Sequence, residues 1–313
     1  METGKGLGRL PYWMLRDDRG LWQGGQPPWT YLQDLAPSAG EQMKGTIIRR
    51  LLAQLPSHVS FHFVFSPRIA NAALVRDVFE KAGFHTYEMK TYLCQPPAGE
   101  DLIAALTGKS IRTNLRQARR DLDLVELSAE EFFAFQDANL KASGKKSYRD
   151  DNADRIMLKH ALARGQAQII AARRKPDENC PAPVLDAAIA CLWDRADGTY
   201  KLWRITNRSG EGENKPHLHG VKFLFLAAME NARAKDLLLD TDGSTPGLAK
   251  LYETFGPGIF EPRIRLHFER KTLWAHFVTD YPSIIRLLAP GLNFLARFDH
   301  HPKAELVSSA RPC

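Results

Sequence analysis

The stretch Leu237-Leu-Leu-Asp-Thr-Asp-Gly-Ser-Thr-Pro-Gly-Leu-Ala-Lys-Leu-Tyr-Glu-Thr-Phe-Gly256 decides the fold. Its leucines run into an acidic turn, which predicts a buried strand over 236–240. Proline and glycine at 246 and 247 are typical of a helix entry, and a glycine at 256 is typical of a helix end, so we expect a helix over 248–254. A further apolar segment predicts a last strand over 259–268. The stretch therefore predicts a strand, a turn, a short helix and a strand.

The residues upstream extend this unit into a larger lobe. Helical periodicity predicts four helices before the stretch, and apolar runs predict three strands. Along the chain, the order is three helices, three strands and one helix. The helices are expected over 110–122, 129–141, 152–164 and 217–234, and the strands over 167–173, 186–193 and 200–205. This order predicts a mixed α/β (α+β) lobe.

The N-terminal part predicts a second, smaller lobe. Its elements are a hairpin over 10–16 and 21–24, helices over 41–55 and 70–82, and strands over 59–65 and 85–94. Gln95-Pro-Pro-Ala-Gly99 is the best linker. At roughly 100–200 residues per domain, 313 residues predict two domains, which we place at 1–98 and 99–313. The C-terminal tail, over 281–298, is expected to form a packed or amphipathic helix pair.

Composition narrows the class of protein. Hydrophobic residues make up 44% and charged residues 25%, which suits a globular chain with a real core. The net charge of +7 favours anionic partners, or it serves solubility alone. The four cysteines form no CxxC pair, and the histidines lack metal-ligand spacing, so we expect a reducing compartment, the cytoplasm, and no metal. No apolar run is long enough for a signal peptide or a membrane span.

Three motifs resemble the Fem-type acetyltransferase-like (GNAT) proteins: the stretch above with its continuation to Arg265, the arginine-rich segment Ser110–Arg120, and the loop Gln26–Tyr31. The resemblance implies two acetyltransferase-like lobes, the first truncated at its N-terminus. It also implies transfer of an acyl or aminoacyl group to a small-molecule amine, without a tightly bound cofactor. The co-substrate would be acyl-coenzyme A or aminoacyl-tRNA, so tRNA is a possible partner. A non-catalytic tRNA- or precursor-binding protein is the alternative.

The short helix departs from this family. In the cell-wall aminoacyl transferases, it carries Phe-Lys, with the lysine implicated in stabilising charge at the reacting centre. The matching pair here is Leu251-Tyr252, which argues against a peptidoglycan bridge enzyme. Tyr252 is nevertheless a catalytic candidate, as an oxyanion donor or proton relay, or else a half-buried helix tyrosine.

Asp240 and Asp242 are the other catalytic candidates. Two residues apart at a strand end, they point to one face if the strand continues, and one of them orients or deprotonates the amine. Alternatively, they bind the backbone of their own turn. The amine would attack a carbonyl that is held beside the strand 186–193.

Two features are candidates for binding donor phosphates. The loop Asn207-Arg208-Ser-Gly210-Glu-Gly212 lets backbone approach a pyrophosphate, although its glutamates argue for a plain polar loop. Arg112, Arg116, Arg119 and Arg120 share one face of the expected helix, opposite Ile111, Leu115, Ala118 and Leu122. That face either binds phosphate or pairs with nearby acidic residues.

Five residues are candidates for binding the acceptor. Trp29 and Tyr31 lie in the aromatic loop, Lys146 and Tyr148 lie in a loop between helices, and Trp203 lies on the strand over 200–205. For the lysine, plain solvation is the alternative.

Overall fold

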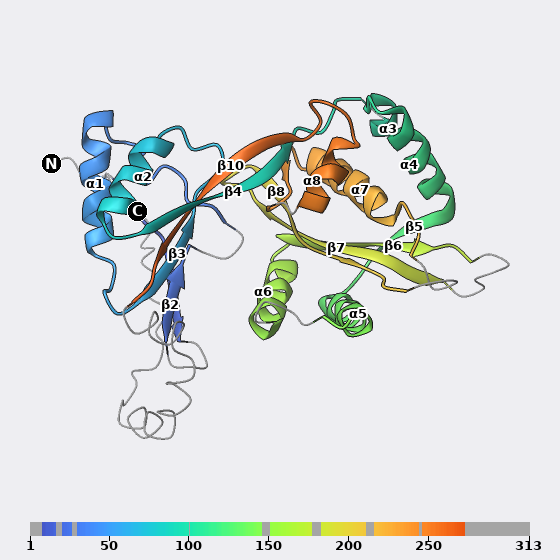
Figure 1. Cartoon of the computed structure of the whole chain (residues 1–313), viewed down its shortest axis with the longest axis horizontal. Coiled ribbons are helices and arrows are strands. Elements are labelled where there is room, and N and C mark those ends of the chain that lie inside the picture. Colours follow the sequence, from blue (N-terminus) through green and yellow to red (C-terminus); the bar gives the residue numbers. More distant parts are fainter. Residues whose placement is uncertain are drawn as a thin grey trace, which may run out of the picture.

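The computed structural model describes residues 8–16, 21–26, 30–99, 101–145, 151–176, 183–210, 216–243 and 246–272. Within these residues, ten strands form one mixed sheet that runs through both lobes (Figure 1). The strands lie in the order β1 (Trp13–Arg16), β2 (Trp22–Gly25), β3 (Ser60–Val64), β10 (Glu261–Arg270), β4 (His85–Cys94), β9 (Leu238–Asp240), β8 (Thr199–Asn207), β7 (Val184–Asp194), β6 (Ala167–Arg174) and β5 (Leu122–Glu126).

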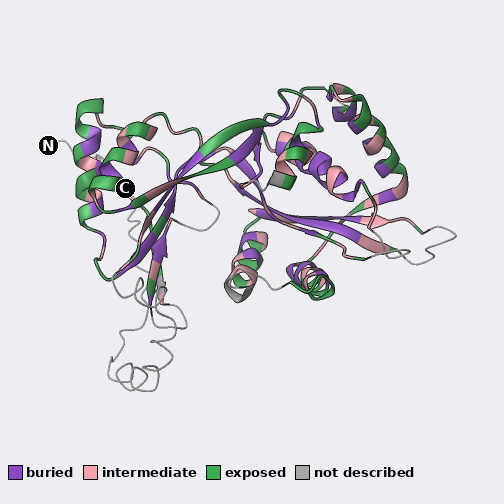
Figure 2. Cartoon of the chain, viewed as in Figure 1, coloured by how far each residue is buried: buried purple, intermediate pink, exposed green. Residues whose placement is uncertain are grey.

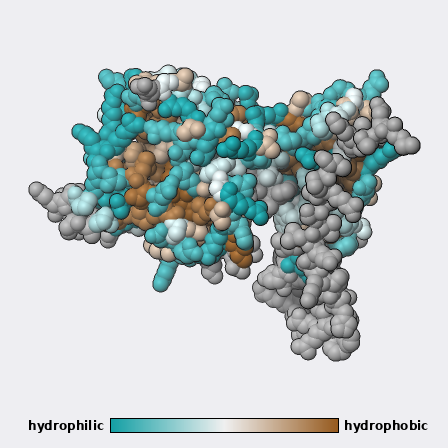
Figure 3. Space-filling model, turned by 180° about the vertical axis from the view of Figure 1, so that it is seen from behind, coloured by the Kyte–Doolittle hydropathy of each residue, from teal (hydrophilic) through white to brown (hydrophobic). Residues whose placement is uncertain are grey.

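Helices cover both faces of this sheet. They are α1 (Glu41–Ala53), α2 (Ala72–Lys81), α3 (Leu102–Ala105), α4 (Lys109–Asp121), α5 (Ala129–Ala142), α6 (Asp151–Ala163), α7 (Gly220–Ala234) and α8 (Pro246–Glu253). In the second lobe, α7 lies on one face of the sheet, and α5 and α6 lie on the other (Figures 1 and 2). Figure 3 shows hydrophobic side chains gathered on this lobe when the molecule is seen from behind. None of the described helices is long and apolar enough to cross a membrane.

The strand pairing shows an internal repeat that the residues do not reveal. The unit β2-α1-β3-α2-β4 matches the unit β8-α7-β9-α8-β10 in order, and the first two strands of each unit are parallel. The last strand of each unit pairs with the middle strand of the other: β4 with β9, and β10 with β3. β4 and β10 also pair with each other, so they form the centre of the sheet.

This exchange ties the two lobes together. Leu266 and Phe268 of β10 are buried in the core cluster that α1, α2 and β3 build. The first lobe is therefore completed by a strand from the far end of the chain. The boundary at residue 98 stays a prediction, and the tail over 281–298 lies outside the described residues.

Most of the expected elements are confirmed. The expected and observed bounds differ by one to three residues for the helices and strands named above, and His85–Cys94 is the same in both. One strand, β5, was missed because it follows α4 without a turn, and Leu122 was assigned to the helix. The strand over 236–240 begins only at Leu238, since Asp236 has a φ of +55° in the turn after α7. Ile111, Leu115 and Ala118 are buried, as the amphipathic pattern of α4 predicts.

Candidate functional site

A pocket of about 320 Å³ lies where the two lobes meet. Residues that follow β2 and the strands β3, β4, β8 and β10 line it, together with the turn after β9. Its lining residues are Gln26, Thr30, Tyr31, His62, Val64, Tyr87, Met89, Lys201, Trp203, Asp242, Arg265 and His267. Three of the sequence candidates, Tyr31, Trp203 and Asp242, thus lie around one cavity.

Alternation along β10 supplies the charged floor of this pocket. Leu266 and Phe268 face the helices of the first lobe, so Arg265 and His267 face the opposite side. The pairing of β10 with β4 sets Arg265 opposite Met89, and His267 opposite Tyr87. The sheet register therefore brings these side chains together.

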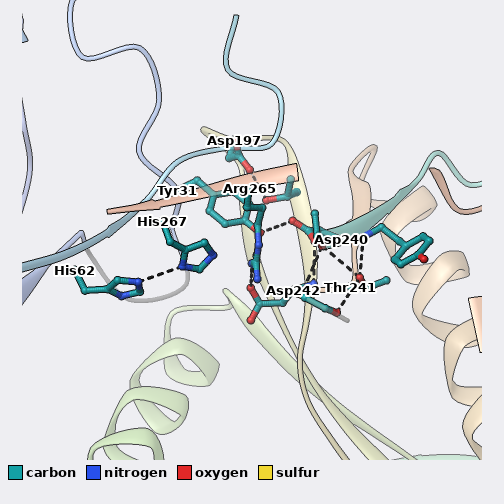
Figure 4. A network of polar contacts seen from close by, with 12 residues as sticks. Tyr31, His62, Asp197, Asp240, Thr241, Asp242, Arg265 and His267 are labelled. Atoms are coloured by element: carbon teal, nitrogen blue, oxygen red, sulfur yellow. Dashed lines mark hydrogen bonds and ion pairs between the residues drawn. The ribbon is translucent and has the colours of Figure 1, made fainter. Parts of the chain in front are cut away.

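A buried hydrogen-bond network organises one end of the pocket (Figure 4). The Tyr31 hydroxyl donates to Asp240 Oδ2 at 2.6 Å and accepts from Arg265 Nη1 at 2.9 Å. The same Nη1 donates to Asp242 Oδ1 at 2.7 Å. Asp240 Oδ1 accepts from Thr91 Oγ1 at 2.6 Å and from the Asp242 amide at 2.9 Å. Tyr31 and Arg265 are thus held between two carboxylates.

The two aspartates do not share one strand face, and that prediction is wrong. Extended backbone ends at Asp240, and Asp242 has a φ of +51° in the following turn. Gly243 follows with a φ of +106°, and a Cβ there would lie 3.0 Å from Arg265 Nη2. Asp240 is fully buried and its carboxylate accepts three hydrogen bonds, whereas 23% of the Asp242 side chain is exposed. Only Asp242 is therefore open to a ligand.

Lys201 is the cation that sequence reasoning missed. It lies on β8 opposite Asp240, and its Nζ is 3.2 Å from the centroid of the Tyr31 ring. Burial lowers the pKa of Lys201, while the charges of Asp242, Asp240, Asp197 and Asp194 oppose this shift. A buried lysine thus lines the pocket together with Asp242.

The parallel pair β8–β9 opens at this position. The pairing with β9 ends with Lys201 opposite Asp240, and from there to Asn207 β8 pairs with β7 along one edge while no described strand pairs with its other edge. The strand β7, by contrast, is paired on both edges, with β6 and with β8. The open edge at this position belongs to β8, and the placement of the donor carbonyl beside 186–193 stays a prediction.

Asp197 connects the lobes above this network. Its buried carboxylate accepts from Thr199 Oγ1 at 2.8 Å and from Gln33 Nε2, and Arg68 of the first lobe lies 3.7 Å away. Burial raises the pKa of Asp197, and these partners oppose the shift. The contact fixes the β7–β8 turn, and hence the start of β8, against the first lobe.

Two histidines form the other end of the pocket. His62 Nε2 lies 3.1 Å from His267 Nδ1 and 3.1 Å from the Tyr87 hydroxyl, and the three rings are stacked. Burial, followed by the nearby charges of Arg265 and His62, lowers the pKa of His267 to about 3. His267 is therefore neutral at pH 7.

This histidine makes stability depend on pH. Because an unfolded histidine has a pKa of about 6.5, the unfolded chain binds the proton first, and stability is lost as the pH falls below that value. Between pH 7 and pH 5, the unfolding free energy should fall by about 2 kcal/mol more in the wild type than in His267→Gln. Urea titrations at both pH values measure this difference. An equal loss in both proteins would contradict it.

Tyr252 lies away from the pocket. Its ring packs in the core of the second lobe against Tyr92, Phe225 and Phe260, at centroid distances of 5.0 to 5.4 Å. Burial raises the pKa of its hydroxyl well above the usual range. We therefore leave Tyr252 out of the site that we propose below.

The two donor-binding features lie at the end of β8 and on α4. Asn207 ends β8, and Arg208 and Gly210 follow it. His217 Nε2, in the segment that leads into α7, lies 3.2 Å from Asp121 Oδ2 at the end of α4. On α4, Arg119 binds Glu230, whereas Arg112 and Arg116 make no ion pair with the described residues. Gly212, Trp29, Lys146 and Tyr148 lie outside the described residues.

The thiols in the described part of the chain do not face the pocket. Cys94 and Cys191 are both buried, and burial raises the pKa of each to about 12. They therefore stay protonated and unreactive at neutral pH. No group of three or more His, Cys, Asp or Glu side chains in the described segments is placed to hold a metal ion.

No protein-family model matches the sequence, and no curated protein matches it. Among solved structures, FemX matches over 83% of this chain and 88% of its own, with a TM-score of 0.53 and 11% identity. L-PGS from Bacillus licheniformis matches over 91% and 89%, with a TM-score of 0.47 and 11% identity. A tandem GNAT protein from the clavulanic acid biosynthesis pathway matches over 80% and 75%, with a TM-score of 0.43 and 12% identity. The chain therefore has the Fem-type acetyltransferase-like fold that its three motifs predict.

Proposed function

We propose that this chain transfers an acyl or aminoacyl group from a phosphate-bearing donor, aminoacyl-tRNA or acyl-coenzyme A, to a small amine by direct attack. The observation that carries this proposal is the placement of Lys201, Asp242 and Arg265 in one pocket where β9 leaves β8. The similarity to FemX supports it at the level of the fold.

Each of the three side chains has a separate role. Asp242 accepts a hydrogen bond from the acceptor amine and holds it near the carbonyl carbon. When the nitrogen attacks, the carbonyl oxygen becomes negative, and the buried ammonium of Lys201 stabilises that charge in a site of low dielectric constant. Arg265 holds the Asp242 carboxylate in place, and the pair Tyr31–Asp240 holds Arg265.

Lys201 supplies the positive charge at the reacting centre that the short helix α8 does not supply. The helix α8 carries Leu251-Tyr252 where the cell-wall enzymes carry Phe-Lys, and Tyr252 is buried in the core. Lys201 approaches the pocket from β8 instead. A cation is thus supplied to the reacting centre from a strand rather than from the helix.

The donor runs along the open edge of β8. From Lys201 to Asn207 the strand spans about 20 Å, which suits a long, thin group with phosphates at its far end. His217, just before α7, contacts Asp121 at the end of α4, so the start of α7 lies next to the last turn of that basic helix. Arg116, which is exposed, and half-buried Arg112 then neutralise phosphates of the donor.

Binding of tRNA without an aminoacyl group, and of coenzyme A without an acyl group, tests this path for the donor. Replacing both Arg112 and Arg116 by glutamine should weaken binding of unfractionated tRNA, and should reduce the slope of log K against log salt by about 0.9 per lost contact. Fluorescence anisotropy from 50 to 300 mM KCl measures the slope. The double variant Arg49→Gln, Arg50→Gln on α1 is the matched control. An unchanged slope removes α4 from the donor site, and binding of coenzyme A without tRNA binding selects the coenzyme.

A further inference from the structure

His267 lines the pocket, and one nitrogen of its buried ring has no hydrogen-bond partner among the described residues. His267 is 5% exposed, and its Nε2 has no hydrogen-bond partner among the described residues. Leaving a buried polar atom unpaired costs about 1–3 kcal/mol, so such an atom in a cavity wall indicates a ligand or a function. The other ring nitrogen, Nδ1, is engaged by His62.

The second histidine leads from the pocket to the surface. His62 is exposed on β3, and its Nε2 is 3.1 Å from His267 Nδ1 (Figure 4). The Tyr87 hydroxyl lies at the same distance from this Nε2 and accepts a hydrogen bond once the nitrogen carries a proton. Two imidazoles in series thus join a buried wall of the pocket to solvent.

We propose that His267 and His62 form a proton relay that removes the proton released by the acceptor amine. The proposal rests on the acyl transfer described above. Before transfer, His267 carries its proton on Nδ1 and donates it to His62 Nε2, which leaves His267 Nε2 free to accept.

The step balances in protons and bonds. The amine nitrogen forms a bond to the carbonyl carbon, and the carbon–oxygen or carbon–sulfur bond to the donor breaks. The amine proton moves to His267 Nε2, the Nδ1 proton moves to His62 Nε2, and His62 releases its own Nδ1 proton to water. The departing alkoxide or thiolate takes up a proton from water, and exchange with solvent restores both tautomers.

The charges around the pair explain why two rings are needed. Arg265 lies beside His267 on the same face of β10, so a second positive charge on the buried ring is unfavourable. Burial lowers the pKa of His62, the charge of Glu269 opposes this shift, and the charge of Arg265 adds to it. The ring neighbours of His62 are Tyr87 on β4 and His267 on β10. The positive charge therefore forms at the surface, while His267 stays neutral throughout.

The tautomer of His267 tests the geometry without any substrate. Long-range proton–nitrogen correlation spectra of protein labelled with ¹⁵N-histidine distinguish a protonated ring nitrogen from an unprotonated one. We expect His267 to be neutral with its proton on Nδ1 between pH 5 and pH 8, with His267→Gln identifying the signals. A proton on Nε2 in the free protein would overturn the relay.

The rate of transfer tests the function. The assay measures acyl transfer to a mixture of free amino acids and polyamines. The donor is acetyl-coenzyme A or aminoacyl-tRNA charged with labelled amino acids. The rate should fall about 10–100-fold in His62→Gln. Added imidazole should restore His62→Gly but not His267→Gln, because only His62 is open to solvent. His85→Gln, exposed on β4, is the control and should keep the wild-type rate.

The outcomes separate the two proposals. The relay is overturned, while acyl transfer stands, if His62→Gln transfers at the wild-type rate. It is also overturned if added imidazole does not restore transfer by His62→Gly. No transfer by the wild type from any of these donors overturns the proposed function, and the relay falls with it.

Discussion

Replacing Lys201 by methionine is expected to lower kcat for acyl transfer by about 100–1,000-fold, the usual cost of losing one group that stabilises an oxyanion. Methionine keeps the length and apolar stem of the side chain but removes the ammonium. Because Lys201 contacts the developing charge rather than the donor phosphates, KM for the donor should change much less than kcat. Steady-state rates with the donor that binds measure both constants.

A lysine outside the pocket provides the control for this prediction. Lys90→Met removes an exposed ammonium from β4 and should keep the wild-type kcat. Circular dichroism and urea unfolding establish that both variants are folded. A Lys201→Met enzyme within about threefold of wild type would show that Lys201 does not stabilise the transition state.

Asp240→Ala should cause the largest loss of stability of any change in the site. The substitution leaves the Tyr31 hydroxyl, the Thr91 hydroxyl and the Asp242 amide without their acceptor, and it removes a negative charge close to buried Arg265. Removing one member of such a buried charged network typically costs about 3–5 kcal/mol. Urea unfolding at pH 7 measures the loss.

The matched control for this change is an exposed aspartate. Asp77 pairs with Lys81 on the surface of α2, and Asp77→Ala should hardly alter the unfolding free energy. If Asp240→Ala were as stable as Asp77→Ala, the network around Asp240 would not be holding the pocket together.

Local pattern predicts the elements of this fold but not how they are exchanged. The alternation over 259–268 predicts β10, because Leu266 and Phe268 must be buried on one face. Nothing local indicates that this strand pairs with β3, about 200 residues earlier in the chain. That pairing depends on the exchange of the last strands between the two repeat units.

The same reasoning explains which site residues were found. Asp242 follows a recognisable turn motif, and Tyr31 lies in a recognisable loop, so both were predicted. Lys201 and Arg265 lie inside strands, where a charged residue usually marks a solvent-facing position. The alternation of Arg263, Arg265, His267 and Glu269 along β10 is the signal that points to a polar face in the middle of the sheet.

Tyr252 shows that a motif match alone does not place a side chain in the pocket. Its position in the short helix matched a functional position of the family, but the helix turns this side chain toward Phe225 and Phe260. The motif identifies the helix, whereas the packing of α8 decides which of its side chains reach the pocket.

The central claim is that the pocket between the lobes transfers an acyl group to an amine. Its most direct test is mass spectrometry of reactions that contain the protein, each donor, and the mixture of amino acids and polyamines. The claim predicts an amide whose mass is that of one amine plus one carboxylic acid less water, formed at similar rates by the wild type and by Lys90→Met and about 100–1,000-fold more slowly by Lys201→Met. Donor binding without any amide, from acetyl-coenzyme A or from aminoacyl-tRNA, would contradict the claim and indicate a non-catalytic binding protein.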